Sequence, residues 1–265
     1  MRTLTIKEVI EATKGVYSNK GFEILITGVS TDSRKINKGD LFIPLTGPNF
    51  DGHDFISQAF EKGAAATLCD RNKKMKVEGL SGKNIIYVKN TQSALLGLAA
   101  YYRKLFDIPF VAVTGSVGKT TTKEMIAEIL KTRFKVLKTP GNLNNEIGLP
   151  LTLFQLDESY QIGVVELGMS GLGEILRMVN IVRPKAAVIT NIGISHIEKL
   201  GSKQNIARAK MEILEPMDKS NLAVLNADSS ELWDVKDTII PKTVFFGQGR
   251  GDVRAKNIKS DDVNG

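Results

Sequence analysis

From residue 110 onward, short apolar runs alternate with segments of helical pattern. Apolar strands that alternate with helices are typical of a parallel sheet covered on both faces. The sequence therefore predicts an α/β fold with a parallel sheet for this part of the chain. The expected strands are residues 110–113, 162–167, 186–190, 222–225 and 243–246. The expected helices between them are residues 119–134, 173–182 and 203–214.

The first part of the chain has shorter and more mixed runs, separated by turn-rich sequences at residues 32–34, 38–40 and 46–49. We expect a small α/β domain over residues 1–85 and a central domain over residues 86–265, with a helix at 91–106. Residues 254–258 resemble the opening of another strand, yet the sequence stops at Gly265. We therefore expect the central domain to be incomplete.

The junction VTGSVGKTTTKEM, residues 113–125, places glycines, a lysine and hydroxyls between a strand and a helix. Free N–H groups and the positive dipole end of a helix collect anions there. Gly118-Lys119-Thr120 matches the end of the nucleotide loop G-x-x-x-x-G-K-[ST], although Val113 replaces its first glycine. We expect Lys119 to reach the β- and γ-phosphates of a nucleotide, and the Thr120 hydroxyl to hold magnesium. The expected phosphate-binding residues are Gly115, Ser116, Gly118, Lys119, Thr120 and Thr121.

Three polar residues accompany the later strands and helices. Glu166 interrupts an apolar strand near its carboxyl end, where ligands bind in parallel sheets, so it is either a magnesium ligand or a carboxylate that reaches solvent. His196 follows the third expected strand at the same edge, although a lone histidine is more often structural. Lys210 lies on an otherwise apolar helix face, from which its ammonium can extend to solvent.

Charge and composition limit the classes of partner. The 36 Lys and Arg residues against 29 Asp and Glu give a net charge of +7, which favours anionic ligands. Because the basic residues do not cluster into an arm, we expect phosphorylated small molecules rather than nucleic acid. The single cysteine, Cys69, excludes an internal disulfide, and no stretch approaches the ~20 apolar residues of a membrane span. We therefore expect a cytoplasmic protein without membrane insertion.

These motifs together resemble the Mur ligase family, the ATP-dependent amide-forming enzymes of peptidoglycan precursor synthesis. Residues 114–121 are similar to its nucleotide loop, and residues 32–34, 39–42 and 51–53 to its UDP-sugar domain. Residues 141–150 resemble the branch that joins D-alanyl-D-alanine to UDP-N-acetylmuramoyl-tripeptide. The same branch is indicated by residues 166–169, 191–196, 200–202 and 206–210.

The resemblance implies a UDP-sugar domain followed by a P-loop ATPase-like domain, and a reaction through an acyl phosphate. It implies ATP and two Mg²⁺ ions, with Lys119, Glu166, His196 and a carbamylated Lys210 as catalytic residues. The implied metal ligands are Thr120, Glu166, His196 and Lys210. The implied substrate contacts are Ser33, Arg34, Asp51, His53, Asn142, Asn144 and Asn145.

Two alternatives stay open. A sister ligase that adds the third peptide residue shares the UDP domain and the metal residues. A nucleotide-binding module without catalysis would need only the phosphate loop. Family members also carry a third domain, which is not visible here, so we expect a truncated form with weak or no turnover. Separately, we expect a monomer.

Overall fold

The structure is a computed structural model that describes residues 1–19, 21, 23–77 and 79–258. Its chain forms two compact units. The first contains Met1–Asp107 and Glu146–Tyr160, and the second contains Ile108–Asn145 and the chain from Gln161 onward. This division falls at Asp107 rather than near residue 85, because the helix after residue 90 packs within the first unit.

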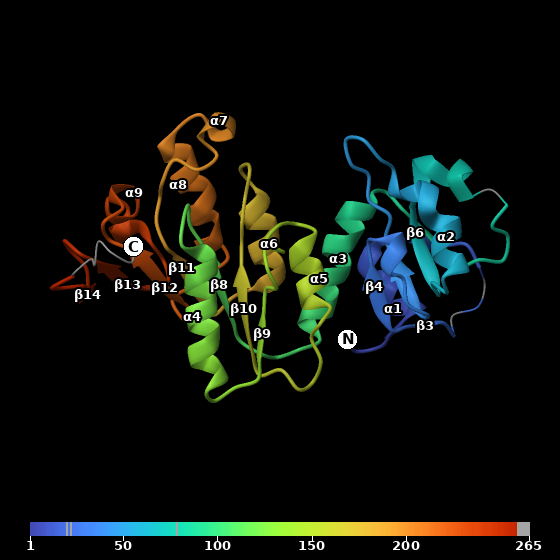
Figure 1. Ribbon diagram of the computed structural model, residues 1–265, viewed down its shortest axis with the longest axis horizontal. Coiled ribbons are helices and arrows are strands. Elements are labelled where there is room, and N and C mark those ends of the chain that lie inside the picture. The colour runs from blue at the N-terminus through green and yellow to red at the C-terminus, as the bar shows by residue number, and fades with distance from the viewer. Residues whose placement is uncertain (20, 22, 78, 259–265) are drawn as a thin grey trace, which may run out of the picture. The chain divides into compact units, whose positions relative to one another are not determined.

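The second unit is built on a fully parallel sheet, as the sequence predicts (Figure 1). Among the described residues its strand order is β14-β13-β12-β11-β8-β10-β9, so the chain leaves β8 and returns on both of its sides. Crevices that bind ligands form at such switch points, outside the carboxyl ends of the strands. The strands are β8 (Phe110–Thr114), β9 (Val136–Lys138), β10 (Ile162–Glu166), β11 (Ala186–Ile189), β12 (Leu222–Asn226), β13 (Lys242–Gly247) and β14 (Val253–Arg254).

Helices connect these parallel strands. The longest, α4, begins directly after the predicted phosphate loop and buries Ala127 against Val113, Val164 and Val188 of the sheet. The helix expected over residues 203–214 ends earlier, at Met211, because Glu212–Leu214 forms a separate 3₁₀ turn. The helices are α4 (Lys119–Lys131), α6 (Glu174–Val182), α7 (Ile197–Leu200), α8 (Lys203–Met211) and α9 (Ser230–Trp233).

The first unit is a smaller α/β structure with a mixed sheet. Within the described residues the order is β2-β7-β6-β5-β4; β4 to β7 are parallel and β2 is antiparallel. Strands β1 and β3 form a separate antiparallel pair. The strands are β1 (Leu4–Thr5), β2 (Val16–Tyr17), β3 (Leu25–Ile26), β4 (Gly28–Ser30), β5 (Asp40–Phe42), β6 (Ala66–Asp70) and β7 (Ile85–Val88).

Local sequence signals explain the helices of the first unit. Thr5 and Glu8 form a reciprocal capping box at the start of α1, which satisfies two otherwise unpaired N–H groups. Asn90 caps α3, and the Tyr102 hydroxyl donates to the Leu156 carbonyl at 2.7 Å, which ties residues 146–160 to this unit. The helices are α1 (Ile6–Thr13), α2 (Ile56–Glu61), α3 (Thr91–Lys104) and α5 (Gly148–Leu153), with short 3₁₀ helices at Ser33–Lys35, Gly52–Phe55, Arg71–Val77 and Lys236–Thr238, the last in the second unit.

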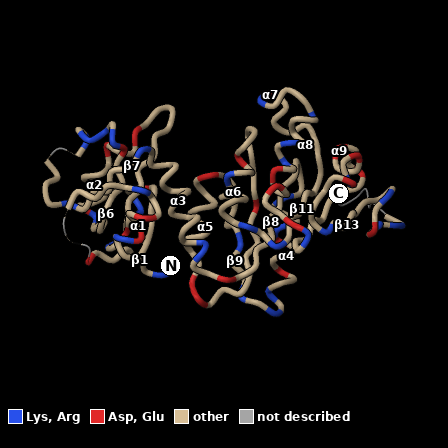
Figure 2. The backbone as a smooth tube through the Cα atoms, turned by 180° about the vertical axis from the view of Figure 1, so that it is seen from behind, with Lys and Arg blue, Asp and Glu red and all other residues tan. Residues whose placement is uncertain are grey.

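Basic and acidic residues are interspersed along both units, and Figure 2 shows no separate basic arm among the residues drawn. In the part of the chain that is described, no helix has both the length and the apolar composition needed to cross a membrane.

Candidate functional site

The predicted phosphate loop lies between β8 and α4, at the carboxyl end of the sheet. Gly115 has φ +149°, and a Cβ atom there would lie 1.8 Å from the Thr190 hydroxyl oxygen. Gly118 has φ +77° and forms the N-cap of α4 with open space beside it. Both glycines are therefore required by conformation, and Gly115 also by a close approach of the chain after β11.

Residues after β11 hold this loop in place. The Asn191 side-chain oxygen accepts hydrogen bonds from the N–H groups of Ser116 and Val117, both at 3.0 Å. The N–H of Gly193 donates to the Ser116 hydroxyl at 2.8 Å. The loop N–H groups converge on an acceptor oxygen, which is the geometry that an anion requires. Asn191 was not among the predicted phosphate-binding residues.

Lys119 folds back over its own loop. Its ammonium donates to the carbonyl oxygens of Gly115 at 2.9 Å and Ser116 at 3.4 Å. These carbonyls belong to the loop itself, so the lysine charge lies at the start of α4. Thr121, the last predicted loop residue, is exposed in the first turn of that helix.

Glu166 lies next to the loop, as the parallel topology predicts. Its side chain is only 1% exposed, and its two oxygens accept hydrogen bonds from the Thr120 hydroxyl at 2.9 Å and the Asn144 amide at 2.7 Å. The Glu166 N–H donates to the Thr139 hydroxyl at 3.0 Å. A carboxylate beside a threonine hydroxyl is a donor set that fits Mg²⁺, which prefers oxygen ligands. The structure thus unites two of the predicted metal ligands.

The other two predicted metal ligands are placed differently. His196 is exposed at the N-cap of α7, with φ +66°. Lys210 is buried in α8, 2% exposed; burial, and then the positive charge of Lys119, lower its pKa to about 8. Among the described residues, no three His, Cys, Asp or Glu side chains form a group that could hold a metal. A second metal site at His196 and Lys210 stays a prediction.

Two of the predicted UDP contacts in the first unit, Ser33 and Arg34, line an open pocket. The pocket has a volume of about 570 Å³ and includes two exposed aromatic rings, Phe50 and Phe55. The Ser33 hydroxyl donates to the side-chain oxygen of Gln58 at 2.9 Å. The pocket is lined by Thr31, Asp32, Ser33, Arg34, Phe42, Phe50, Gly52, Phe55 and Gln58.

Arg34 reaches solvent at the rim of this pocket. Its guanidinium makes a two-pronged ion pair with Asp32, at 2.9 Å for both Nε and Nη2, while its side chain is 82% exposed. The hydrogen bonds from the side chain and then the backbone of Arg34 lower the pKa of Asp32 to about 2. A fork that binds a carboxylate in this way can also bind a diphosphate.

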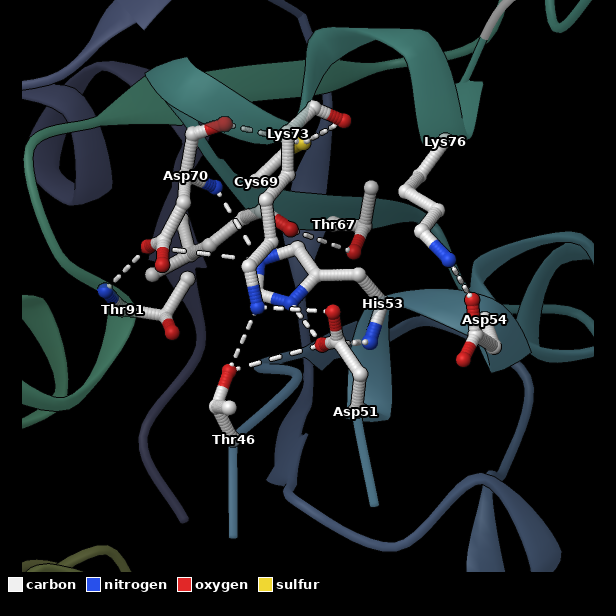
Figure 3. Close-up of polar contacts among 11 residues, drawn as sticks. Thr46, Asp51, His53, Asp54, Thr67, Cys69, Asp70, Lys73, Lys76 and Thr91 are labelled. Atoms are coloured by element: carbon white, nitrogen blue, oxygen red, sulfur yellow. Dashed lines mark hydrogen bonds and ion pairs between the residues drawn. The ribbon is translucent and has the colours of Figure 1, made fainter. Parts of the chain in front are cut away.

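His53 lies inside the first unit rather than on the pocket surface. Its side chain is fully buried, Nδ1 donates to Asp51 at 2.7 Å, and Nε2 accepts the Asp70 N–H at 3.1 Å (Figure 3). Lys73 binds the other Asp51 oxygen at 2.7 Å and the Thr46 hydroxyl at 2.7 Å. Burial raises the pKa of Asp51, but the bonds from Lys73 and His53 outweigh it and lower that pKa overall. His53 and Asp51 therefore brace the turn that carries Phe50.

Of the remaining predicted contacts, Asn142 and Asn145 are exposed and Asn144 binds Glu166. Sequence reasoning missed Asn191, Gln58, Lys73 and Thr139. Asn191 follows a predicted strand at the carboxyl edge, a position that could have indicated it. Nothing in the sequence pattern distinguishes the other three from surface residues.

The phosphate loop, the adjoining carboxylate and the separate pocketed α/β unit agree with the comparisons with known proteins. Residues 113–265 match the Mur ligase middle domain, and residues 25–103 match the Mur ligase family catalytic domain. The chain belongs to the Mur ligase family.

Two of its relatives belong to the same branch of that family. The chain is 45% identical over 225 residues to UDP-N-acetylmuramoyl-tripeptide–D-alanyl-D-alanine ligase of Bacillus subtilis, covering 84% of this chain and 49% of the relative. The Escherichia coli ligase of the same name is 39% identical over 245 residues, with coverage of 92% and 52%. The chain spans about half the length of these relatives.

Solved structures give the same result. A crystal structure of MurF from Acinetobacter baumannii has a TM-score of 0.87 at 33% identity, covering 98% of this chain and 56% of that one. MurF ligase from Thermotoga maritima, solved in complex with ADP, has a TM-score of 0.80 at 34% identity, with coverage of 88% and 53%.

Proposed function

We propose that this chain supplies the UDP-binding and ATP-binding units of a ligase that joins D-alanyl-D-alanine to UDP-N-acetylmuramoyl-tripeptide. The observation that carries the proposal is the contact between Thr120 of the phosphate loop and the buried Glu166. The names of the relatives, at 45% and 39% identity, favour this branch over the sister ligase that adds the third residue.

In the proposed reaction, the terminal carboxylate of the tripeptide attacks the γ-phosphorus of ATP, and the bond to ADP breaks. The resulting acyl phosphate is attacked by the amine of D-alanyl-D-alanine, which loses a proton, and the tetrahedral intermediate expels inorganic phosphate. The loop N–H groups and Lys119 would orient the phosphates and offset their charge. Thr120 and Glu166 would hold Mg²⁺, which would offset the negative charge of the phosphates when bound.

The first unit would bind the UDP end of the substrate. An apolar pocket with exposed phenylalanine rings suits a nucleobase, because aromatic rings stack on bases. Arg34 at the rim would exchange Asp32 for a phosphate, and Ser33 would donate or accept a hydrogen bond. Asp51 and His53 would act indirectly by holding the turn that carries Phe50.

Lys210 is proposed to work as a carbamate. A pKa of about 8 leaves part of the amine neutral near physiological pH, and a neutral amine attacks CO₂ and releases a proton. The product is an anionic oxygen ligand, suited to a second Mg²⁺ with His196.

The test is phosphate release from ATP by the complete gene product that contains this chain. Release should require both UDP-N-acetylmuramoyl-tripeptide and D-alanyl-D-alanine. Release with the dipeptide substrate and a diamino acid would instead identify the sister ligase. Nucleotide binding without phosphate release under any of these conditions would identify a binding module.

We also propose a cytoplasmic location, supported by the lone buried cysteine.

A further inference from the structure

Lys123 is a fully buried lysine on α4, one turn after Thr120. Its ammonium donates to the Thr139 carbonyl at 2.8 Å and lies 3.0 Å from a carboxylate oxygen of Glu124. Glu124 is 40% exposed and also pairs with Lys138. The Lys123 ammonium is thus fixed between a partly solvated carboxylate and one backbone carbonyl.

Burying the Lys123 ammonium costs desolvation free energy, and filling space in the core would not require that cost. Removing an ammonium from water is unfavourable unless its partners compensate, and a well-packed apolar side chain at such a position is often as stable or more so. Nearby on the same helix, Ala127 fills its buried position with a methyl group. What Lys123 does here that an apolar side chain could not do is donate a hydrogen bond to the Thr139 carbonyl.

Thr139 connects this carbonyl to the candidate metal site. Its N–H donates to the Val164 carbonyl at 3.1 Å, and its hydroxyl accepts the Glu166 N–H at 3.0 Å. Five residues later, Asn144 donates to the Glu166 carboxylate at 2.7 Å, and its own carbonyl accepts the Gly168 N–H at 2.7 Å. The segment from Thr139 to Asn144 therefore holds Glu166 through both its backbone and its side chain.

We propose that Lys123 is a positioning residue, which fixes the segment 139–144 so that the Glu166 carboxylate stays directed at the Thr120 hydroxyl. Lys123 itself touches neither nucleotide nor metal. Thr120 and Lys123 lie one helical turn apart on α4. Thr120 is hydrogen-bonded directly to Glu166, and Lys123 is connected to Glu166 through Thr139. The inference rests on the proposed nucleotide function of the same site. It concerns the increase in nucleotide affinity that Mg²⁺ produces.

The experiment measures ADP binding to the 265-residue chain by titration calorimetry, with and without Mg²⁺. In Lys123→Met, which keeps length and loses the hydrogen bond, the enhancement of ADP affinity by Mg²⁺ should fall about tenfold. Affinity without Mg²⁺ should change less than twofold, because the loop and Lys119 are untouched. Lys131→Met is the matched control, since Lys131 is exposed on the same helix and pairs with Glu128. It should behave as wild type.

Thr139→Val provides a second route to the same answer. It removes the hydroxyl acceptor of the Glu166 N–H but leaves the carbonyl that Lys123 binds, and it should reduce the Mg²⁺ enhancement in the same way. If Lys123→Met is unfolded by circular dichroism, Lys123→Gln, a smaller change at the same position, takes its place in the comparison. A folded Lys123→Met with lower thermal stability and a full Mg²⁺ enhancement would overturn the inference, as would a full enhancement in Thr139→Val.

The two proposals fail in different ways. A wild-type chain that binds ADP neither with nor without Mg²⁺ would refute the nucleotide function, and the inference with it. A wild-type chain with a clear Mg²⁺ enhancement that Lys123→Met retains would refute only the role of Lys123.

Discussion

The phosphate loop of the second unit was predicted from a short motif, and the UDP contacts of the first unit from motifs that resemble the family. The two sets of residues differ in how the structure places them. In the second unit, Thr120 and Glu166 are 46 positions apart and share a hydrogen bond. In the first unit, Arg34 is exposed on an ion pair, whereas His53 is buried with both ring nitrogens occupied.

The difference follows from topology. The carboxyl ends of parallel strands lie at the same edge of the sheet. The strand pattern alone therefore predicts that a residue at the end of a strand lies at this edge. The first-unit motifs lie on 3₁₀ turns, Ser33–Lys35 and Gly52–Phe55, where a shift of one residue turns a side chain from the surface to the core. The following predictions test this contrast, from the largest effect to the smallest.

Lys119→Ala should remove the main positive charge at the phosphate loop. We expect kcat/KM for phosphate release by the complete gene product to fall at least roughly 100-fold, the scale found when a preorganised charge stabiliser is lost. The free energy of unfolding, measured in urea, should change little, because the Lys119 ammonium is hydrogen-bonded to two carbonyls of its own loop. Turnover within threefold of wild type would show that the loop has been misinterpreted.

Lys210→Met should make the second unit more stable at neutral pH, by up to about 3 kcal/mol, because burial lowers the lysine pKa from 10.5 to about 8. The unfolded chain binds more protons between these values, so wild-type stability should rise with pH from about 8 to 10.5. The variant should lose this rise, and the same substitution in the complete gene product should abolish the proposed ligase activity. Unfolding in urea at pH 7, 9 and 10.5 checks this, and an identical pH profile in both proteins would contradict it.

His53→Ala should destabilise the first unit by about 2–3 kcal/mol, because it leaves the buried Asp70 N–H without its acceptor and removes the imidazole hydrogen bond to Asp51. Lys76→Ala, which breaks an exposed pair with Asp54, is the control and should leave the stability nearly unchanged. Urea unfolding measures both. Weaker binding of the UDP substrate at unchanged stability would place His53 in direct contact with ligand, as the family resemblance implies.

Arg34→Ala should have the smallest effect on the fold, since its guanidinium is exposed. We expect UDP-N-acetylmuramoyl-tripeptide to bind roughly tenfold more weakly while ADP affinity is unchanged, because a phosphate loses a two-pronged partner. The pKa of Asp32 should move from about 2 back toward 3.8, and carboxyl NMR titration can follow it. Equal substrate affinity in calorimetry would remove Arg34 from the proposed site.

The sequence by itself determined the parallel α/β class of the second unit, the strand-loop-helix of residues 110–131 and the proximity of Glu166 to Thr120. Apolar periodicity and glycine-lysine spacing are local signals, and the sheet geometry converts them into positions in space. Short elements such as β9, α5 and α7 lack enough periodicity to be recognised in this way.

Only the tertiary structure decided which polar side chains are buried and what holds them. The sequence does not show the partners of Asn191, Lys123 and His53, and each makes hydrogen bonds to groups 16 to 75 positions away. Such partners are chosen by the packing of distant segments, where a buried polar group must find a complement, and no local pattern specifies that choice.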